Sequence, residues 1–397
     1  MKMLRIAAVL VCWLTFAGVL SAEALRFSHI NTQNSGLSYD GVRCMLRDSR
    51  GYVWIGTQKG LSRYDGARFK VFDRTDFSVE SDYINSLCED AKGNILIGTD
   101  KGIVIYDPVM DNISPLDGIS CRVYTMCSVD DGRIYLGVKS EGLYVYDAFD
   151  RTISKIKLIN PDGQILRDIY RMAVGKNDVM YLAAYCDNLY CVSMNELGAS
   201  AMTSYVTGDS ATFDKDDIEG LAVKSRNHSM LYVLSQEKGL VEVNSLASRT
   251  RTLVSLSENV FPTNLQYHEG KLWVTSSQGL HEYDLTSREH RSYTSDPRDR
   301  YSLSDSYTTC VLHSDEGRTM WVGTSGGGIS VYSSASDDFR KLYRTADGTS
   351  LDGCNVRCLA EDSFGRMWLG TETEGLLFTG GAELRCRDMR RLRDWAR

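Results

Sequence analysis

Short stretches in which apolar and polar residues alternate recur along almost the whole chain, separated by turns rich in glycine and aspartate. Alternation with a period of two is typical of strands that bury one face. In the first complete stretch it predicts four short strands, at residues 42–46, 52–56, 61–64 and 67–72. Asp48 and Gly51 occupy the first and fourth positions of a predicted type I turn, where these residue types are preferred.

One pattern within these stretches occurs eight times. The copies lie at residues 54–65, 96–107, 135–147, 181–193, 231–244, 272–284, 320–333 and 367–380. From Gly60 in the first copy to Gly375 in the last is 315 residues over seven intervals, so the period averages 45. Four short strands per repeat of this length indicate the blade of a β-propeller.

A single four-stranded sheet cannot cover both of its apolar faces, whereas blades stacked around an axis cover one another. We therefore predict an all-β fold, a propeller of four-stranded blades. Eight copies either close one ring together, or seven close it and the eighth begins a second array. The first and last copies are unusually alike, which favours a seven-bladed propeller over residues 25–345, an eighth repeat at 346–380 that starts an incomplete second propeller, and a basic irregular tail at 381–397.

The N-terminal segment 1–24 has the pattern of a secretory signal peptide. Lys2 and Arg5 precede an apolar run at residues 6–20, and Ala22 and Ala24 form a small-x-small cleavage pattern. The alternative, an uncleaved membrane anchor, needs about 20 apolar residues. We expect a periplasmic product that has no membrane span after signal cleavage.

Composition and charge narrow the class of protein. Of the 397 residues, 43% are hydrophobic and 24% charged, which is typical of a folded protein. The formal net charge of −7 argues against nucleic acid as a partner. The C-terminal segment is rich in arginine and breaks the repeat, which is explained either by a solvated tail or by a truncated or frameshifted gene product.

The eleven cysteines are predicted to be mostly unpaired, buried thiols. Cys44 and Cys358 occupy the same position of the first strand in two repeats, and Cys88 and Cys127 occupy a second position that Leu46 fills in the first copy. A position that also accepts leucine is an apolar one, where cysteine acts as a small hydrophobe. The alternative is a local disulfide, for which the pairs are Cys186–Cys191 and Cys121–Cys127.

Catalytic and metal-binding motifs are not evident. The six histidines are scattered and no C-x-x-C pair occurs, so we expect no metal and no cofactor. Asp48, Asp90 and Asp362 recur at one repeat position, which favours a structural role in the turn over catalysis. Trp54, Trp273, Trp321 and Trp368 also share a position and are predicted to pack between blades.

The sequence Trp-Ile-Gly-Thr-x-x-Gly-Leu-x-x-Tyr-Asp, preceded by Asp-x-x-Gly-x-x-Trp, resembles the two-component regulator propeller repeat. The resemblance covers residues 30–380, and it is strong in copies one, two, seven and eight and weak in copies four and five. It implies the N-terminal periplasmic sensor part of a hybrid two-component system, an oligosaccharide ligand and signalling through a homodimer. Kinase activity would then belong to C-terminal domains that this sequence does not include, and the chain itself would not be an enzyme.

Two functions follow as hypotheses. The first is an exported ligand-sensing propeller, and the alternative is a stand-alone exported enzyme, a hydrolase or lyase, that acts on glycans. The first strand of each blade should line the central opening, and the position after its first apolar residue varies between blades: Arg43, Asn85, Tyr124, Tyr170, Glu219, Pro262 and Thr308. Of these we predict Arg43, Tyr124, Tyr170 and Glu219 as ligand-binding residues, although unconstrained positions that face solvent would vary in the same way.

Overall fold

Strands make up nearly all of the regular structure. The computed structural model describes residues 25–77, 81–175, 178–208, 212–224, 229–314, 318–334, 354–363, 367–372, 375–380 and 383–387. Its contacts divide the chain into two units, residues 1–333 and 334–397. The predicted signal peptide and the predicted boundary after residue 345 lie outside the described residues.

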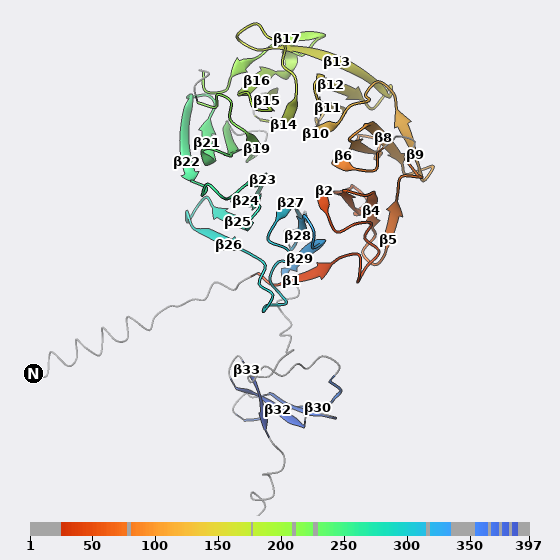
Figure 1. Ribbon diagram of the computed structural model, residues 1–397, viewed down its shortest axis with the longest axis vertical. Coiled ribbons are helices and arrows are strands. Elements are labelled where there is room, and N and C mark those ends of the chain that lie inside the picture. The colour runs from red at the N-terminus through yellow and green to blue at the C-terminus, as the bar shows by residue number, and fades with distance from the viewer. Residues whose placement is uncertain are drawn as a thin grey trace, which may run out of the picture. The chain divides into compact units, whose positions relative to one another are not determined.

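The first unit is a ring of blades, numbered here in chain order, and Figure 1 shows their innermost strands around a central opening. Blade 1 comprises β2 (Val42–Arg47), β3 (Val53–Thr57), β4 (Leu61–Tyr64) and β5 (Phe69–Phe72). Blade 2 comprises β6 (Ile84–Glu89), β7 (Ile95–Thr99), β8 (Gly102–Asp107) and β9 (Asn112–Leu116). Blade 3 comprises β10 (Val123–Ser128), β11 (Arg133–Val138), β12 (Gly142–Asp147) and β13 (Thr152–Ile159). Blades 4 and 5 comprise β14 (Ile169–Val174), β15 (Val179–Ala184), β16 (Leu189–Ser193), β18 (Ser204–Tyr205); and β19 (Ile218–Val223), β20 (Met230–Ser235), β21 (Gly239–Asn244), β22 (Arg249–Val254). Blade 6 comprises β23 (Pro262–His268), β24 (Lys271–Ser276), β25 (Gly279–Asp284) and β26 (His290–Tyr293).

Blade 7 takes its strands from both ends of the ring. Its first three are β27 (Thr308–His313), β28 (Thr319–Thr324) and β29 (Ile329–Ser333), and its outermost strand is β1 (Phe27–Ile30). β1 pairs antiparallel with β29, from Phe27 opposite Tyr332 to Ile30 opposite Ile329. The beginning of the ring thus completes its last blade, so that hydrogen bonds close the circle (Figure 1).

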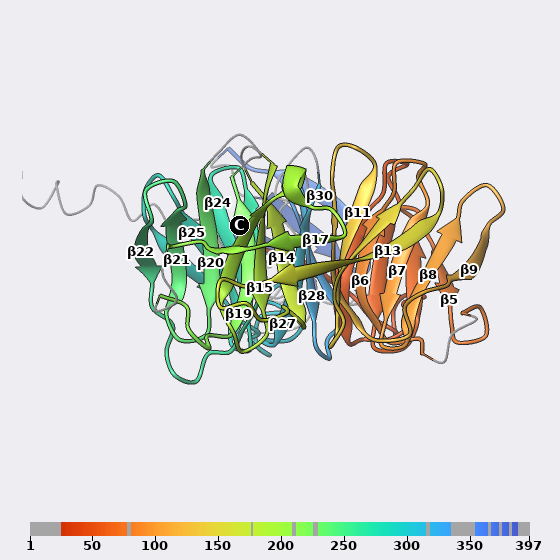
Figure 2. The same cartoon turned by 90° about the horizontal axis from the view of Figure 1, so that it is seen from above.

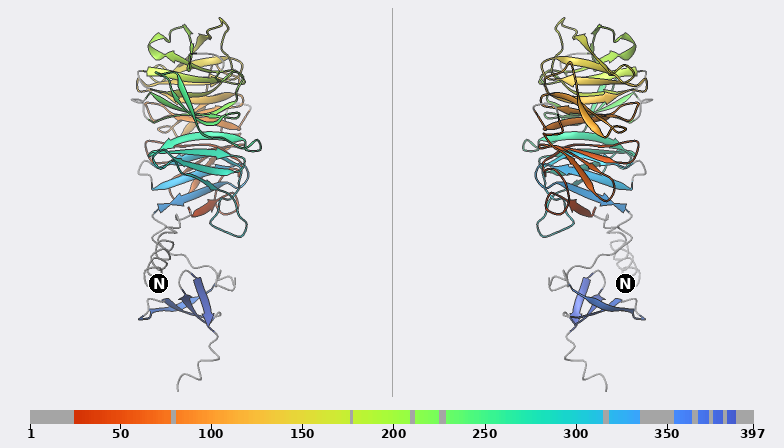
Figure 3. Two further views of the ribbon diagram at one scale, coloured as in Figure 1. Left: turned by 90° about the vertical axis from the view of Figure 1, so that its left-hand side faces the viewer. Right: turned by 90° about the vertical axis from the view of Figure 1, so that its right-hand side faces the viewer.

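Within the described blades, neighbouring strands are antiparallel, with one addition. β17 (Ser200–Met202), which follows the short 3₁₀ turn η2 (Met194–Glu196), pairs parallel with β13 and extends the sheet of blade 3. Figures 2 and 3 view the ring from its edge, where the blades stand side by side around the circle. The predicted propeller fold is confirmed, and the seven sheets among the described residues of the ring are consistent with the seven-bladed interpretation.

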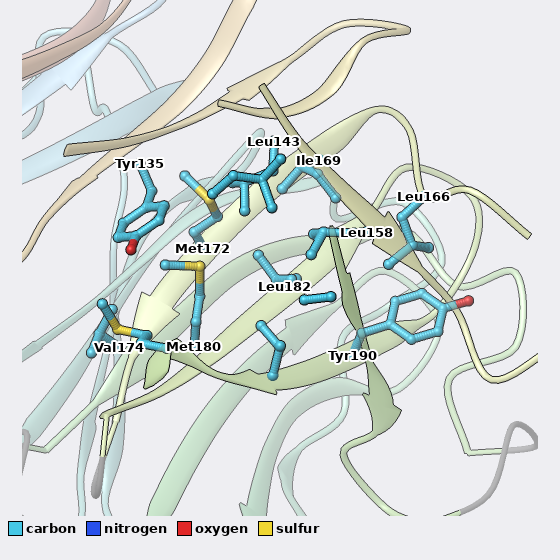
Figure 4. Packing of buried hydrophobic residues seen from close by; sticks show 14 of the residues in the cluster. Tyr135, Leu143, Leu158, Leu166, Ile169, Met172, Val174, Met180, Leu182 and Tyr190 are labelled. Atoms are coloured by element: carbon cyan, nitrogen blue, oxygen red, sulfur yellow. The ribbon is translucent and has the colours of Figure 1, made fainter. Parts of the chain in front are cut away.

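The hydrophobic core lies between the blades. Seven clusters of buried residues occur in the described part of the ring, and each joins one face of a blade to the facing side of the next. Figure 4 shows the cluster between blades 3 and 4, where Tyr135 and Leu143 meet Ile169 and Leu182. The cluster between blades 7 and 1 includes Trp321 and Val42, so the ring closes by packing as well as by pairing.

The Gly-Thr-x-x-Gly part of the repeat has a steric explanation. A side chain at Gly56 in β3 would meet Ile84 of the next blade at 2.6 Å, so glycine here lets the neighbouring first strand approach. The hydroxyl of Thr57 donates to the carbonyl of Gly60 at 2.9 Å and accepts from the amide of Lys59 at 3.0 Å. Gly60 adopts φ +87°, a conformation that suits glycine.

The recurring aspartate of the first turn has the expected structural role. Asp48 is buried, and its carboxylate accepts the amide of Tyr52 and the indole N–H of Trp54, each at 2.9 Å. Asp362 accepts the indole N–H of Trp368 at the same distance. In blade 2, Asp90 accepts the backbone and side-chain amides of Asn94 at 2.9 and 2.8 Å. One carboxylate therefore orders the turn and satisfies a donor buried between blades.

The second unit contains one further sheet, and residues 383–387 of the segment predicted as an irregular tail form one of its strands. The sheet comprises β30 (Val356–Glu361), β31 (Met367–Thr371), β32 (Leu376–Gly380) and β33 (Glu383–Arg387). β33 lies within the segment predicted to be irregular and pairs antiparallel with β32 from Gly380 opposite Glu383 to Leu376 opposite Arg387. Its sequence places Leu384 and Cys386 between charged residues, a strand alternation that the arginine-rich composition obscured.

Three of the cysteines proposed for local disulfides carry free thiols. Cys121, Cys186 and Cys191 are unpaired, which excludes both the Cys121–Cys127 and the Cys186–Cys191 bridge. Cys88 and Cys310 are buried, as predicted for small apolar residues. Cys186 and Cys358 are exposed, so burial does not extend to every position.

Candidate functional site

The first strand of every blade carries an irregularity at the same place. In β2, the pairing with β3 skips from Val42 to Cys44, so that Arg43 is an extra, bulged residue. The same one-residue shift occurs in the first strand of each other blade of the ring. A bulge redirects a side chain out of the regular pleat. The bulged residues are Arg43, Asn85, Tyr124, Tyr170, Glu219, Thr263 and Thr309.

These seven side chains line one cavity, of about 680 Å³, at the centre of the ring. All four residues predicted to bind a ligand are among them: Arg43, Tyr124, Tyr170 and Glu219. Each of the four is half-buried. The structure thus brings together residues that are up to 176 positions apart in the chain, from Arg43 to Glu219.

In blades 6 and 7 the predicted position is one residue too early. The bulged residues there are Thr263 and Thr309, in place of Pro262 and Thr308. Pro262 still lines the cavity, but Thr308 is buried and its hydroxyl donates to the carbonyl of Gly279 at 2.8 Å. The predicted position was counted from the first apolar residue of each first strand. The first strands of blades 6 and 7 begin with proline and threonine, where the other blades have valine or isoleucine, so the count started one residue too early.

A second set of lining residues precedes the first strands and was missed by the sequence analysis. Arg122, Asp217, Phe261 and Tyr307 each stand immediately before a first strand and line the cavity. Phe261 and Tyr307 are 55% and 43% exposed, unusual values for such large apolar rings. The signal that could have found them is their common spacing, two residues before each bulge. The lining also includes the apolar side chains that stand two residues after the bulge in blades 1 to 5: Met45, Leu87, Met126, Met172 and Leu221.

Aromatic side chains form a continuous wall on blades 3 and 4. The rings of Tyr124 and Tyr170 meet edge to face with centroids 5.2 Å apart, and Tyr170 meets Tyr185 at 5.8 Å. The guanidinium of Arg171 lies 4.1 Å from the centroid of the Tyr170 ring, a cation–π contact. This wall offers flat apolar faces beside hydroxyl groups, which suits a ligand that is itself both polar and apolar.

Two arginines that line the cavity form ion pairs with carboxylates. Arg171 donates from Nε to the carbonyl of Glu219 at 2.7 Å and from Nη2 to its carboxylate at 3.3 Å. Arg122 pairs with Asp100 at 2.8 Å, and Asp100 also accepts the side-chain amide of Asn85 at 2.8 Å. These contacts connect blade 4 to blade 5 and blade 2 to blade 3, and they fix the side chains that face the cavity.

Burial raises the pKa of two groups that line the cavity, Glu219 and Tyr124. It raises the pKa of Glu219, and the nearby cation of Arg171 opposes this rise. Burial also raises the pKa of Tyr124, followed by the effect of the Asp168 carboxylate, while Arg122 lowers it. The phenol of Tyr124 is therefore a neutral hydrogen-bond donor near neutral pH. Within the described ranges, no group of three or more His, Cys, Asp or Glu side chains is placed to hold a metal ion.

Fold and site together define this chain as a repeat-built β-propeller with a polar, aromatic-walled cavity on its axis. Residues 36–59, 78–101 and 350–373 match the family described as Two component regulator propeller. These three segments fall in copies one, two and eight, where the resemblance stated from the sequence is confirmed; copy seven, also described as a strong match, is not among the matched residues.

Solved structures of similar fold include two bacterial extracellular domains. Two extracellular domains ascribed to hybrid two component systems of B. thetaiotaomicron superpose with TM-scores of 0.64 and 0.65, at 18% and 21% identity. Each alignment covers 92% of this chain but only 49% and 47% of those domains, so this chain spans about half their length. Virginiamycin B lyase from Staphylococcus aureus superposes with a TM-score of 0.60 at 10% identity, over 78% of this chain and 99% of the lyase. No curated protein matches the sequence.

Among the residues that the structure describes, no helix has the length and apolar character to span a membrane.

Proposed function

We propose that this chain is an exported ligand-sensing propeller, which binds oligosaccharides in its central cavity. The single observation that carries the proposal is the convergence on that cavity of seven bulged residues of five different types, arginine, asparagine, tyrosine, glutamate and threonine. A turn or packing function would favour the same residue type in each repeat, as it does for Asp48 and Asp362. Different residues at one equivalent position provide the asymmetric wall that an asymmetric ligand requires.

The chemistry of the wall fits a sugar. Pyranose rings present apolar C–H faces and hydroxyl edges, and the cavity offers aromatic faces at Tyr124, Tyr170, Phe261 and Tyr307. Carboxylates such as that of Glu219 accept charge-assisted hydrogen bonds from hydroxyl groups. The extracellular domains of similar fold, ascribed to two component systems, support a sensing role over a purely structural one. Signal output would then pass through parts of a longer protein.

The direct test is a thermal shift measured with a panel of plant and animal oligosaccharides. A ligand that binds only the folded state raises the melting temperature, because it stabilises that state by RT ln(1 + L/Kd), where L is the free ligand concentration. We expect Tyr124→Ala, Tyr170→Ala and Glu219→Ala each to reduce that affinity about tenfold or more, since each removes a stacking face or an acceptor. Phe149→Ala is the matched control, because Phe149 is 68% exposed and does not line the cavity. Unchanged affinity in all three cavity variants would contradict this location.

A glycan-active hydrolase or lyase is the second candidate, and two observations favour it. A lyase has a similar fold, and the raised pKa of Glu219 is typical of a general acid in a cleft. The two functions separate in one experiment, in which purified protein is incubated with the same oligosaccharides and the mixture is analysed by mass spectrometry. Cleaved or unsaturated products would establish the enzyme, while a thermal shift without products would establish the sensor.

A further inference from the structure

The charges of the cavity wall do not all have partners. Arg122 is paired with Asp100, and Arg171 with Glu219. Arg43 differs from both, because its Nε is buried and donates to no acceptor, and no carboxylate lies within ion-pair distance of it among the described residues. Its guanidinium lies 4.9 Å from the centroid of the Tyr83 ring. This cation–π contact gives the guanidinium a neighbour but provides no oxygen or nitrogen acceptor for its N–H groups.

The thiols beside Arg43 do not supply the missing negative charge. Burial raises the pKa of Cys44 far above its ordinary value and that of Cys310 to about 11, although Arg43 opposes both rises. Both thiols therefore remain protonated and neutral at any physiological pH. A guanidinium without an acceptor in the chain is costly, and Arg43 lines the cavity, so an acceptor that enters the cavity and binds its Nη groups would recover part of that free energy.

Acceptors lie in another part of the same cavity, on blade 5. Asp217 and Glu219 both line it, and Asp217 accepts a weak bond from the Cys186 thiol at 3.2 Å. Arg43 belongs to blade 1, which is not a neighbour of blade 5 in the ring. One wall thus offers an unpaired cation and another offers carboxylates that can accept hydroxyl protons.

We propose, on the basis of the proposed function, that the ligand is an acidic saccharide whose carboxylate or sulfate group pairs with Arg43. Its hydroxyl groups donate to Asp217 and Glu219 on the opposite side of the cavity. Arginine suits this role because its planar fork binds carboxylates and sulfates through two parallel hydrogen bonds. A neutral saccharide of the same length could use the aromatic wall and the carboxylates but would leave Arg43 unsatisfied.

The test compares matched probes by isothermal titration calorimetry on the full chain. The probes are a galacturonic acid trisaccharide, a neutral galactose trisaccharide and a sulfated galactose trisaccharide, and the proteins are the wild type, Arg43→Gln, Arg43→Lys and the control Arg68→Gln. Arg68 is exposed in the turn between β4 and β5, away from the cavity. We expect an acidic probe to bind wild type at least about tenfold more tightly than the neutral one, and Arg43→Gln to abolish that preference. Arg43→Lys should retain part of it, and Arg68→Gln all of it.

The two acidic probes identify the source of the negative charge, because preference for one over the other distinguishes a carboxylate from a sulfate ester. Equal binding of neutral and acidic probes, or a preference that survives Arg43→Gln, would overturn this inference while leaving the proposed function intact. Binding of none of the probes would overturn this inference, while the oligosaccharide panel described above decides the proposed function. Thermal unfolding of each variant checks folding, and Arg43→Lys keeps the test decisive if Arg43→Gln does not fold.

Discussion

At the scale of single residues, two kinds of equivalent position behave in opposite ways. Asp48 and Asp362 keep the same residue type because the turn and a buried indole need the same carboxylate in each repeat. The bulged position holds arginine in blade 1 and glutamate in blade 5, and both side chains line the cavity. Constancy therefore indicates structure in this protein, and variation indicates the site.

The turn carboxylate can be tested by removing it. Asp48→Ala should lower the free energy of unfolding by about 2–3 kcal/mol, because it leaves the Trp54 indole and the Tyr52 amide as buried donors without acceptors. Urea denaturation followed by tryptophan fluorescence measures the change. Asp117→Ala is the control, since Asp117 is exposed and should tolerate alanine with little loss. Equal effects of the two substitutions would contradict the structural role of Asp48.

Buried histidines should make stability depend on pH. Burial lowers the pKa of His313 to about 3 and that of His281 to about 4, from an ordinary value near 6.5. The His313 ring stacks on His268 with ring centroids 4.1 Å apart and donates from Nδ1 to Oε1 of Gln266 at 2.9 Å. The positive charge of Lys271 also lowers the pKa of His313. Below pH 6.5 these histidines are protonated in the unfolded chain but remain neutral in the folded chain. The free energy of unfolding is therefore highest above pH 6.5 and falls as the pH drops toward 4.

Thermal denaturation between pH 8 and pH 4.5 measures this dependence. The melting temperature of the wild type should fall through the window below pH 6.5, and the fall should be shallower in His313→Gln, which keeps a hydrogen-bonding side chain beside Gln266. Identical pH profiles for the two proteins would show that His313 does not contribute.

At the scale of elements, the decisive feature is the strand that closes the ring. β1 comes from the opposite end of the unit and supplies the outer strand of blade 7, and Phe27 within it is 1% exposed. Phe27 packs in the cluster between blades 6 and 7, edge-on to Tyr293 and Tyr332. The closing strand is thus held by side-chain packing in addition to four register pairs with β29.

Phe27→Ala should therefore cost about 3–5 kcal/mol of stability, the usual range for a large-to-small change in a core. Unfolding in urea measures the loss, and limited proteolysis should show earlier cleavage at the N-terminal side of the ring. Val71→Ala is the control in an outer strand, because Val71 is 42% exposed. A loss no larger than that of the control would mean that β1 is not needed for closure.

At the scale of the whole molecule, noncovalent packing holds the ring together. Cys310 shares its surroundings with Val42 of blade 1, next to Gly323, whereas Cys44 lies beside Ile84 of blade 2, next to Gly56. The two thiols therefore face successive spaces between blades, and a sheet separates them. Neighbouring blades carry cysteines at equivalent positions without bringing their sulfurs together.

We accordingly expect a reductant to leave stability unchanged. Thermal unfolding with and without dithiothreitol should give the same melting temperature for freshly purified protein, and mass spectrometry after alkylation should find the ring thiols modified once the protein is unfolded. A drop of several degrees with the reductant would reveal a disulfide that this structure does not contain.

The repeat and the fold class could be predicted from the sequence because both arise from local interactions. Alternation, glycine with positive φ at Gly60 and the turn carboxylate of Asp48 act within one blade, and a blade of this kind has to bury its faces against another. The strand β33 was missed because arginine-rich composition outweighed a short alternation, and β1 could not be predicted because its partner β29 lies about 300 residues away.

The sequence by itself determined that this chain forms blades and which of its residues vary at the inner strand. Only the tertiary structure decided which of them meet. In each first strand the bulge selects the residue whose side chain leaves the regular pleat, and the curvature of the ring brings seven such side chains to one axis. It thereby corrected Pro262 and Thr308 to Thr263 and Thr309, added Phe261 and Tyr307 to the cavity, and left Arg43 without an acceptor. Such facts depend on contacts between blades, and no single repeat contains them.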